Sequence, residues 1–522
     1  MTTEVVAAAG ADRQQAAAIT PRQPRLDRFE LAVLGVLVAV SLWILALDLW
    51  QVVVHHRTWT GTDGEFLADQ MQYLAWIRDS SHHFLVSDLF VLRSTPHEYF
   101  QPIVVVSAAL AALGVSPWVA LLVWKPVAVV AVFLGVRALA RRALPERFDH
   151  RAALVLALFF GSWGTLGDEW IPFWSWGYPF ALLGIAALAG ALVCYDSDRA
   201  HGRLTWRAPL LGLAASLSHP WQGELLILIL IGAEAVSWRP STKLRQRLPL
   251  PSVTIAATAL PLLYYEALYR FDPAWRAAQH AAKHQFSLGT IVMPLIPLLI
   301  AAALAYRRRP QRFIGVVTRT WPIAALAIYG LSETGVAGTP LHAFGGITIP
   351  LAVLAVEGVQ SVGFRRLPHW RLVGTALIAA ATIPATVAML RGAHSYVDPM
   401  PDNANFITGS ERRALDYLRT DPRPGGVLAR NYFGLIVPAE TNRRTYIGLC
   451  LWSEPHCIRR MNDTIALMDG SYRPAAAQAF VRSTGARFVL QDCESHGDLS
   501  AALGPIVSST KRFGCATVYE VS

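Results

Sequence analysis

The chain has 522 residues, of which 53% are hydrophobic and only 16% are charged, and its mean hydropathy is +0.36. A soluble domain carries about a quarter charged residues, so this composition excludes an ordinary soluble protein and predicts a mainly α-helical protein that crosses the membrane many times. The net charge of +10 does not indicate nucleic-acid binding, because the bases lie between apolar runs, where they set the orientation of membrane helices.

Residues 1–28 are rich in Ala, Gln and Arg and show no apolar period, which predicts a disordered cytoplasmic tail. Arginines of this tail stand before the first long apolar run, 29–54. Basic residues beside membrane helices favour the cytoplasmic side, so we expect the N-terminus inside and the next loop outside.

Applied along 29–391, the same rule predicts a transmembrane domain of eleven spans that includes the outer loop 55–101. The run 208–238 has cytoplasmic bases at both ends, so we expect two short helices that meet at a break near Pro220. Residues 102–114 are apolar but too short to cross, and we expect them in the outer interface. The predicted spans are 29–54, 117–139, 152–165, 176–195, two within 208–238, 251–269, 290–306, 313–331, 347–363 and 372–390.

From residue 392 the composition turns polar, and 392–522 is predicted to form a small extracytoplasmic α/β domain. Ser410 is expected to cap a helix, and the segments 427–433, 488–493 and 516–521 are typical of strands.

Four of the five cysteines fall in this last domain, while Cys194 stands alone at the end of a predicted membrane helix. Four cysteines in one small outer domain predict two disulfides, which require an oxidising compartment. Of the three possible pairings we expect the short-loop pairs, Cys450–Cys457 and Cys493–Cys515. Buried reduced thiols are the alternative.

The first outer loop carries far more ionisable side chains than a connector between two helices needs. Thr62 or Asp63 is expected to cap a helix that continues through Arg78. Asp69 and Tyr73 are four residues apart and therefore share one face of that helix.

A carboxylate in this loop can accept a proton from a hydroxyl nucleophile, or help to hold a divalent metal through its oxygens. The alternative is that the acids cap the helix and balance its dipole. Capping accounts for Asp63 and Glu65 more easily than for Asp69, which lies two turns in.

The predicted chain has a cytoplasmic N-terminus, one span, a long acidic outer loop with a D-x-x-x-Y pattern, an interface helix that opens at a proline and a cytoplasmic arginine cluster. The C-terminal domain adds the motifs ALDYLRT, IVPAETNRRTYIGL and VYEV. This architecture resembles the GT-C superfamily, membrane glycosyltransferases that use polyprenyl-phosphate-linked sugars, and the C-terminal motifs are similar to those of its actinobacterial members.

The resemblance implies that an aspartate early in the first outer loop is the base that deprotonates the acceptor hydroxyl. Asp69, with Tyr73, matches the pattern; Asp63 is the competing candidate because it lies closer to the first span. Asp168 and Glu169 stand where some relatives carry a metal-binding acidic pair, which implies an optional Mg²⁺ or Mn²⁺ cofactor. Adjacent acids point to different faces of a helix or strand, which argues against a shared ion.

A lipid-phosphate donor also implies groups that stabilise the negative charge of the departing phosphate. The alternative for the bases of the outer loops is that they meet anionic lipid headgroups. His219, at the break near Pro220, is interpreted as a hydrogen-bonding partner for freed backbone groups. The residues assigned to substrate binding are Glu65, Tyr73, Arg78, Arg270, His280, Lys283, His284 and His342.

The resemblance thus implies a hexosyl- or pentosyltransferase of a bacterial plasma membrane. It would move a sugar, with inversion, from a polyprenyl-phosphate donor to a cell-envelope glycan or glycolipid. A transporter or flippase of lipid-linked glycans is one alternative, but it would show repeat-related halves and a midplane site, whereas the polar residues here gather at the outer face. A non-catalytic envelope scaffold is the other, and it would have no use for the acid-rich loop.

Overall fold

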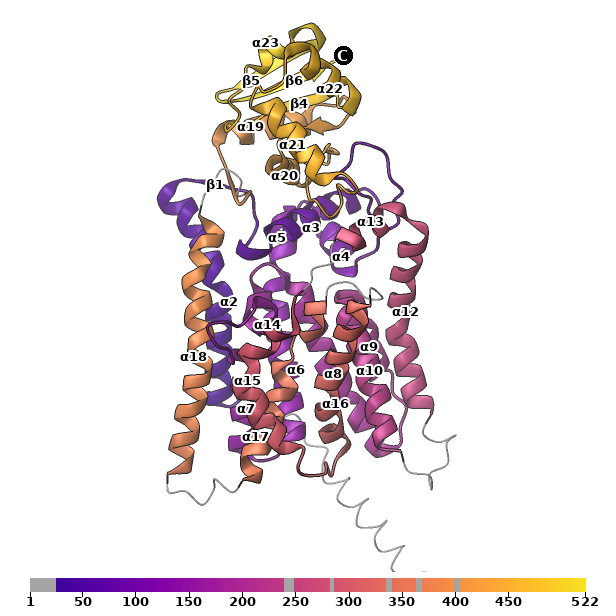
Figure 1. The fold of residues 1–522 in the computed structure, drawn as a ribbon, viewed down its shortest axis with the longest axis vertical. Helices are drawn as coiled ribbons and strands as arrows, with labels where there is room; N and C mark the ends of the chain where they lie inside the picture. The colour runs from indigo at the N-terminus through magenta and orange to yellow at the C-terminus, as the bar shows by residue number, and fades with distance from the viewer. Residues whose placement is uncertain (1–24, 239–247, 282–285, 335–339, 363–368, 399–403) are drawn as a thin grey trace, which may run out of the picture.

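The computed structural model describes residues 25–238, 248–281, 286–334, 340–362, 369–398 and 404–522. A bundle of long helices forms the body of the molecule, and a small sheet with its own helices caps one end (Figure 1). Short helices lie between the two parts: α3 (Leu67–Ser80), α4 (Pro102–Ala112) and α13 (Pro273–Ala281). The mainly helical fold agrees with the prediction.

Six helical segments of the described residues are long and apolar enough to cross a membrane. They are α2 (Arg28–His55), α5 with α6 (Pro117–Leu122 and Trp124–Ala143), α8 (Pro179–His201), α14 with α15 (Leu288–Val292 and Ile296–Ala305), α16 (Phe313–Glu333) and α18 (Trp370–Val397). The other predicted spans coincide with shorter or more polar helices, namely α7 (Arg147–Phe159), α9 (Arg207–Ser218), α10 (Pro220–Val236), α12 (Pro249–Phe271) and α17 (Thr348–Ser361). A total of eleven crossings stays a prediction.

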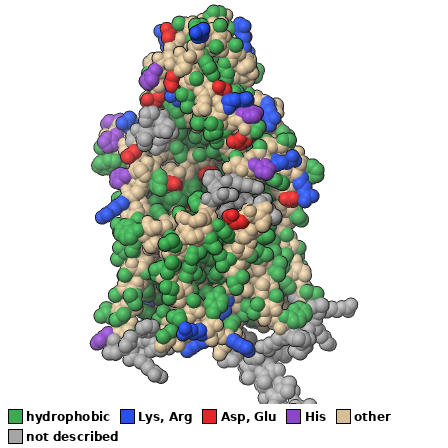
Figure 2. All heavy atoms as spheres, in the orientation of Figure 1, with side chains coloured by type: hydrophobic (Ala, Val, Ile, Leu, Met, Phe, Trp, Pro, Cys, Tyr) green, Lys and Arg blue, Asp and Glu red, His purple; other side chains and the backbone are tan. Residues whose placement is uncertain are grey.

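The body carries a belt of exposed apolar side chains. Figure 2 shows Lys and Arg along the lower rim and again over the upper half, with mostly hydrophobic side chains in the band between. Trp50, Leu263 and Leu377 are more than half exposed on three different helices. A surface of this kind is stable in hydrocarbon and not in water.

The pair α9 and α10 is broken at His219, whose backbone is extended, and Pro220 opens the second helix. The two helices fold back on each other and approach closely. A side chain on Gly223 would collide with Ser216, and one on Gly212 would touch Leu226. The predicted break between two short helices is therefore confirmed.

The C-terminal residues form a four-stranded sheet in the order β3-β4-β6-β5. β3 and β4 are parallel, and the other neighbours are antiparallel. The strands are β3 (Val427–Leu428), β4 (Phe488–Gln491), β5 (Val507–Phe513) and β6 (Ala516–Val521), and the helices are α19 (Gly409–Thr420), α20 (Asn431–Thr441), α21 (Cys457–Met468), α22 (Pro474–Thr484) and α23 (Leu499–Leu503).

Two local predictions for this part were wrong. Thr408, not Ser410, caps α19, because its hydroxyl accepts from the Glu411 N–H while Glu411 accepts from the Thr408 N–H. The predicted strand 427–433 ends after Leu428, and Asn431 begins α20, whose apolar side chains pack against α3.

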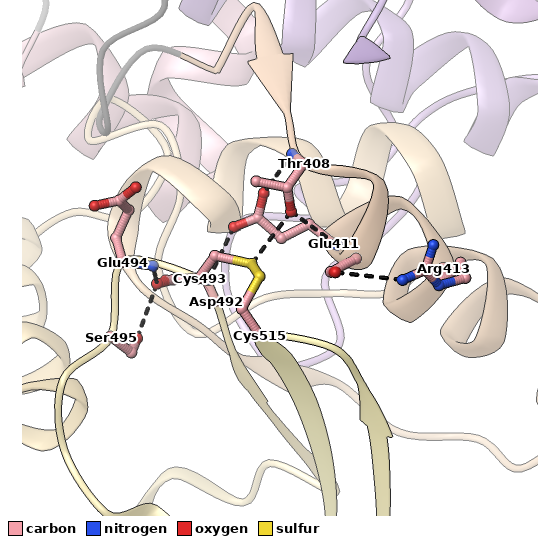
Figure 3. The surroundings of a disulfide bond; sticks show 9 residues. Thr408, Glu411, Arg413, Asp492, Cys493, Glu494, Ser495 and Cys515 are labelled. Carbon is pink, nitrogen blue, oxygen red and sulfur yellow. Dashed lines mark hydrogen bonds between the residues drawn. A yellow bond between two sulfur atoms is a disulfide. The ribbon is translucent and has the colours of Figure 1, made fainter. Parts of the chain in front are cut away.

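Both predicted disulfides are confirmed, Cys450–Cys457 and Cys493–Cys515. Figure 3 shows the second one beside the start of α19. The Cys493 N–H donates to the Glu411 carboxylate at 3.0 Å, so the disulfide fixes the helix cap as well as the strands.

Contacts between distant parts of the chain hold α3 under the C-terminal region. Its Arg78 Nε donates to the carbonyl of Ala439 at 2.7 Å, and Trp452 Nε1 donates to Gln72 Oε1 at 2.5 Å. The two-residue strand β1 (Thr58–Trp59) also pairs with β2 (Phe406–Ile407). Together these contacts, called here the α3 clamp, fix the loop 55–101 against the C-terminal region.

Candidate active site

Asp63 forms a buried ion pair with Lys125. Its carboxylate contacts the ammonium of Lys125, and these side chains are 3% and 4% exposed. Lys125 also donates to the carbonyl of Ser41 at 2.8 Å, and the Gln70 side chain exchanges two hydrogen bonds with the Asp63 main chain. The expectation that Thr62 or Asp63 caps the helix was wrong, because α3 begins at Leu67 after a 3₁₀ turn. The Asp63 side chain makes no cap hydrogen bond, and the Thr62 hydroxyl donates to Asn405 Oδ1 instead.

Asp48 on α2 was missed by sequence reasoning. Its side chain is fully buried, interacts electrostatically with Lys125 and Asp63, and has no hydrogen-bond partner among the described residues. The available signal was an acid inside an apolar run, which usually faces a partner. The buried ammonium of Lys125 therefore balances the charge of two acids, Asp63 and Asp48.

Asp69 lies in the first turn of α3, and the expectation that it lies two turns into the helix was wrong, because α3 begins at Leu67. Asp69 is partly exposed and forms no ion pair with a described residue. Burial raises the pKa of Asp69 to about 6, while His342 lowers it and Asp168 raises it further. Such a carboxylate is mostly ionised at neutral pH but is a stronger base than an ordinary aspartate.

Asp168 lies in the 3₁₀ turn Gly167–Glu169 and His342 in the 3₁₀ turn Pro340–Phe344, and both interact with Asp69. His342 Nδ1 lies 2.8 Å from Asp168 Oδ2, and Trp174 Nε1 donates to the Asp168 carbonyl at 3.0 Å. Gln222 fixes the loop of His342 by donating to the carbonyl of Gly345 at 3.2 Å. The structure thus brings together one unpaired acid and one acid–imidazole pair.

His219 lies in the same cluster, with its ring centroid 5.3 Å from that of His342. It is 1% exposed, and neither ring nitrogen has a hydrogen-bond partner among the described residues. The interpretation that His219 satisfies freed backbone groups was wrong. An imidazole buried without a partner beside a candidate site has its donor available for a ligand.

Aromatic side chains wall the cluster. Tyr73 Oη donates to Tyr178 Oη at 3.1 Å, and Phe66 stacks on Trp174 with centroids 5.6 Å apart. Tyr265, near the end of α12, interacts electrostatically with both tyrosines. Tyr73 thus lies on the same side of α3 as Asp69, as predicted from their spacing.

Glu65 and Glu169 flank the cluster. Burial raises the pKa of Glu65 to about 7; a hydrogen bond with Tyr396 lowers it and Asp168 raises it. Burial raises the pKa of Glu169 to about 8, and its Oε2 accepts from the Leu166 N–H at 3.0 Å. Asp168 and Glu169 therefore turn to different partners, as the argument from adjacent acids predicted.

The described residues around Asp69 do not offer three converging ligands to a divalent metal. Among the described residues, the only three His or acid side chains whose ligand atoms lie within 4.8 Å of one another are Asp79, His83 and His97. A metal bound by Asp168 and Glu169 stays a prediction, and the cluster around Asp69 does not fit the ion without movement.

Arg78 lies on the opposite side of α3 from Asp69, nine residues further along the helix. With Trp59, Trp118 and Arg412 it lines a separate cavity of about 530 Å³ below the C-terminal region. The structure thus places Arg78 away from the cluster.

The bases of the loop after α12 are exposed at one edge of the molecule. Arg270 pairs with Glu266 at 2.6 Å one turn earlier, and His280 Nε2 lies 3.4 Å from Tyr269 Oη. Lys283 and His284 lie outside the described residues. A role of these four residues in substrate binding stays a prediction.

No protein-family model and no curated protein sequence matches the chain. Solved structures do match. The oligosaccharyltransferase of Archaeoglobus fulgidus, tethered to an acceptor peptide with an NVT sequon, has a TM-score of 0.53 and 14% identity over 95% of this chain and 74% of that one. The same enzyme with an inhibitory peptide and a dolichol-phosphate has a TM-score of 0.53 and 13% identity over 95% of this chain and 74% of that one.

A second similar structure is the arabinofuranosyltransferase AftD from mycobacteria, with a TM-score of 0.56 and 11% identity. The match covers 96% of this chain but only 42% of AftD. At such identities the likeness concerns the fold.

Proposed function

We propose that this chain, which has the fold of the GT-C membrane glycosyltransferases, transfers a sugar from a polyprenyl-phosphate donor to a hydroxyl of a cell-envelope glycan or glycolipid. The observation that carries the proposal is the position of Asp69 on that fold. Its carboxylate forms no ion pair with a described residue, has a raised pKa and lies close to the Asp168–His342 pair. A fold alone does not fix a function, so the argument rests on the chemistry of these residues.

In the proposed reaction Asp69 is the general base. It takes the proton of the acceptor hydroxyl as that oxygen attacks the anomeric carbon, and the bond from this carbon to the phosphate oxygen breaks. Attack from the face opposite the departing phosphate inverts the anomeric centre. The products are the glycosylated acceptor and the lipid phosphate, and the proton leaves from Asp69 to water.

Negative charge develops on the departing phosphate, and donors aimed at it lower the barrier. His342 and His219 are the nearest candidates, because both imidazoles lie in the cluster and His219 has no other partner among the described residues. Tyr73, Tyr178 and Trp174 supply apolar faces and hydroxyls of the kind that line ligand pockets.

Mg²⁺ or Mn²⁺ is an optional partner in this proposal. Asp168 already pairs with His342, so it would hold an ion only after the cluster had moved. A bound ion would add positive charge near the phosphate. No step above depends on it.

We also propose that residues 392–522 lie outside a bacterial plasma membrane and contribute to acceptor binding. The rim rich in arginine lies at the end of the bundle away from the C-terminal sheet, which favours a cytoplasmic rim. Two disulfides in the C-terminal part favour an oxidising, extracytoplasmic location.

The test is transfer of radiolabelled sugar from decaprenyl-phosphate donors to membrane acceptors by purified protein. Asp69→Asn keeps the shape of the side chain and loses its basicity, so turnover should fall by roughly 10²–10⁴-fold while donor binding survives. Glu65→Gln is the matched control, because it removes a second acid with a raised pKa beside Asp168.

Should Glu65→Gln abolish transfer while Asp69→Asn keeps it, the base is Glu65. Full activity of both variants would show that the loop is not catalytic and would favour the transporter alternative.

A further inference from the structure

A second cluster of ligating side chains lies at the far end of α3. Asp79 is buried in the last turn, and His83 and His97 are exposed in the loop that follows. Asp79 is ten residues from Asp69, or about 15 Å along the helix, so this cluster is separate from the candidate active site.

The spacing of the three side chains suits a small tetrahedral ion. Each offers one ligand atom, and the three atoms lie within 4.8 Å of one another. Asp79 Oδ1 and His97 Nε2 are 3.5 Å apart, and the rings of His83 and His97 have centroids 4.1 Å apart. Zinc ligands at about 2.0–2.1 Å lie roughly 3.3 Å from each other in a tetrahedron, which is close to the spacing of Asp79 and His97.

The carboxylate of Asp79 is already oriented for such a role. Its Oδ2 accepts from the main-chain N–H of Ser87 at 3.0 Å and from the Ser87 hydroxyl at 3.2 Å. These two bonds leave Oδ1 directed at His97. Hydrogen bonds of this kind to a ligating carboxylate are a regular part of metal sites, because they fix the side chain before the ion binds.

We propose that Asp79, His83 and His97 bind one Zn²⁺. Two imidazoles and one carboxylate form a ligand set that suits Zn²⁺ better than Mg²⁺, because Mg²⁺ prefers oxygen ligands. Water completes the fourth position, since His83 and His97 are open to solvent.

The ion would close the loop between Asp79 and His97. That loop is hydrogen-bonded to the C-terminal region. The Thr445 N–H donates to the Leu89 carbonyl at 3.0 Å, and Ser453 Oγ donates to the Phe90 carbonyl at 3.0 Å. Cross-linking the ends of a loop removes conformational freedom from its open states. Zinc would therefore stabilise the α3 clamp and take no part in sugar transfer.

The experiment uses the full chain in detergent, stripped with chelator and titrated with ZnCl₂ by calorimetry. We expect one ion per chain and a higher unfolding temperature on binding. Replacing ligands in the His83→Ala/His97→Ala double variant should weaken binding by at least about 100-fold, since disturbing only a supporting residue costs 10–100-fold. Ser87→Ala tests that support and should fall in the smaller range.

His82→Ala is the matched control, because His82 is an exposed neighbour of the same type outside the cluster. It should bind zinc like the unchanged protein. Equal binding by the unchanged protein and the double variant would overturn the proposal. His342→Ala should leave this zinc site intact, so the outcome is independent of whether the chain transfers sugars.

Discussion

Asp63 and Asp69 are six residues apart in the same loop, yet their surroundings are opposite. Asp63 is 2% exposed, and its carboxylate is bound to the ammonium of Lys125. Asp69 is partly exposed and faces His342 and Asp168 without an ion pair among the described residues.

The difference separates a structural acid from a chemical one. A carboxylate whose charge is already neutralised by a buried partner cannot take up a proton without breaking that pair. One whose pKa is raised by burial, with no partner, is ready to do so. We therefore assign Asp69, and not Asp63, to proton transfer.

The largest effect is expected from Asp63→Asn. It removes the acid that contacts Lys125 and leaves only Asp48 to balance that buried ammonium. Breaking one side of a buried pair costs about 3–5 kcal/mol of stability. Denaturant unfolding in mixed micelles measures the loss. Any active protein that remains should keep its turnover per folded molecule.

The Asp63→Leu/Lys125→Met double variant, made in an Asp48→Asn background so that no buried acid loses its cation, sharpens this prediction. Replacing a whole buried charged group by apolar residues is often close to neutral. Its stability should recover most of the loss. A double variant as unstable as Asp63→Asn would mean that the pair does not account for the role of Asp63.

On the side of Asp69, His342→Ala removes the imidazole that pairs with Asp168. If His342 donates to the developing charge, turnover should fall by roughly 10²–10³-fold, the cost of one such donor. Steady-state transfer assays at saturating donor measure it. An unchanged turnover with a higher KM would instead assign His342 to binding alone.

The smallest effect is a change in pH dependence. Because Asp69 works as the ionised base and its pKa is raised to about 6, activity should be full above pH 7 and fall about tenfold per unit below 6. An ordinary aspartate would keep full activity down to about pH 5. A profile of kcat/KM that is flat between pH 5 and 7 would contradict the assignment.

The sequence predicts what depends on near neighbours. Spacing placed Asp69 and Tyr73 on one side of a helix, short loops predicted both disulfides, and the break at Pro220 followed from bases at both ends of one run. The resemblance to the GT-C superfamily is also confirmed at the level of the fold.

What sequence could not predict depends on distant packing. Asp168 and His342 are 174 positions apart, so only the fold shows that they pair. The sequence also did not show that Lys125 pairs with Asp63. The strand β5 was not predicted because its residues are mostly polar and exposed, as suits an edge strand. Residues 431–433, expected to end a strand, begin a helix because packing against α3 overrides strand propensity.

The α3 clamp also has a consequence for the order of assembly. Its hydrogen bonds reach Ala439 and Trp452, which follow their partners by 361 and 380 positions. At about 5–20 residues per second, roughly 20–70 s of synthesis separates α3 from these residues. A nascent chain therefore displays Asp69 on a helix that can already contact Tyr178 and Phe180 but lacks its hydrogen bonds to the C-terminal region. Those bonds form only when Ala439 and Trp452 have left the ribosome.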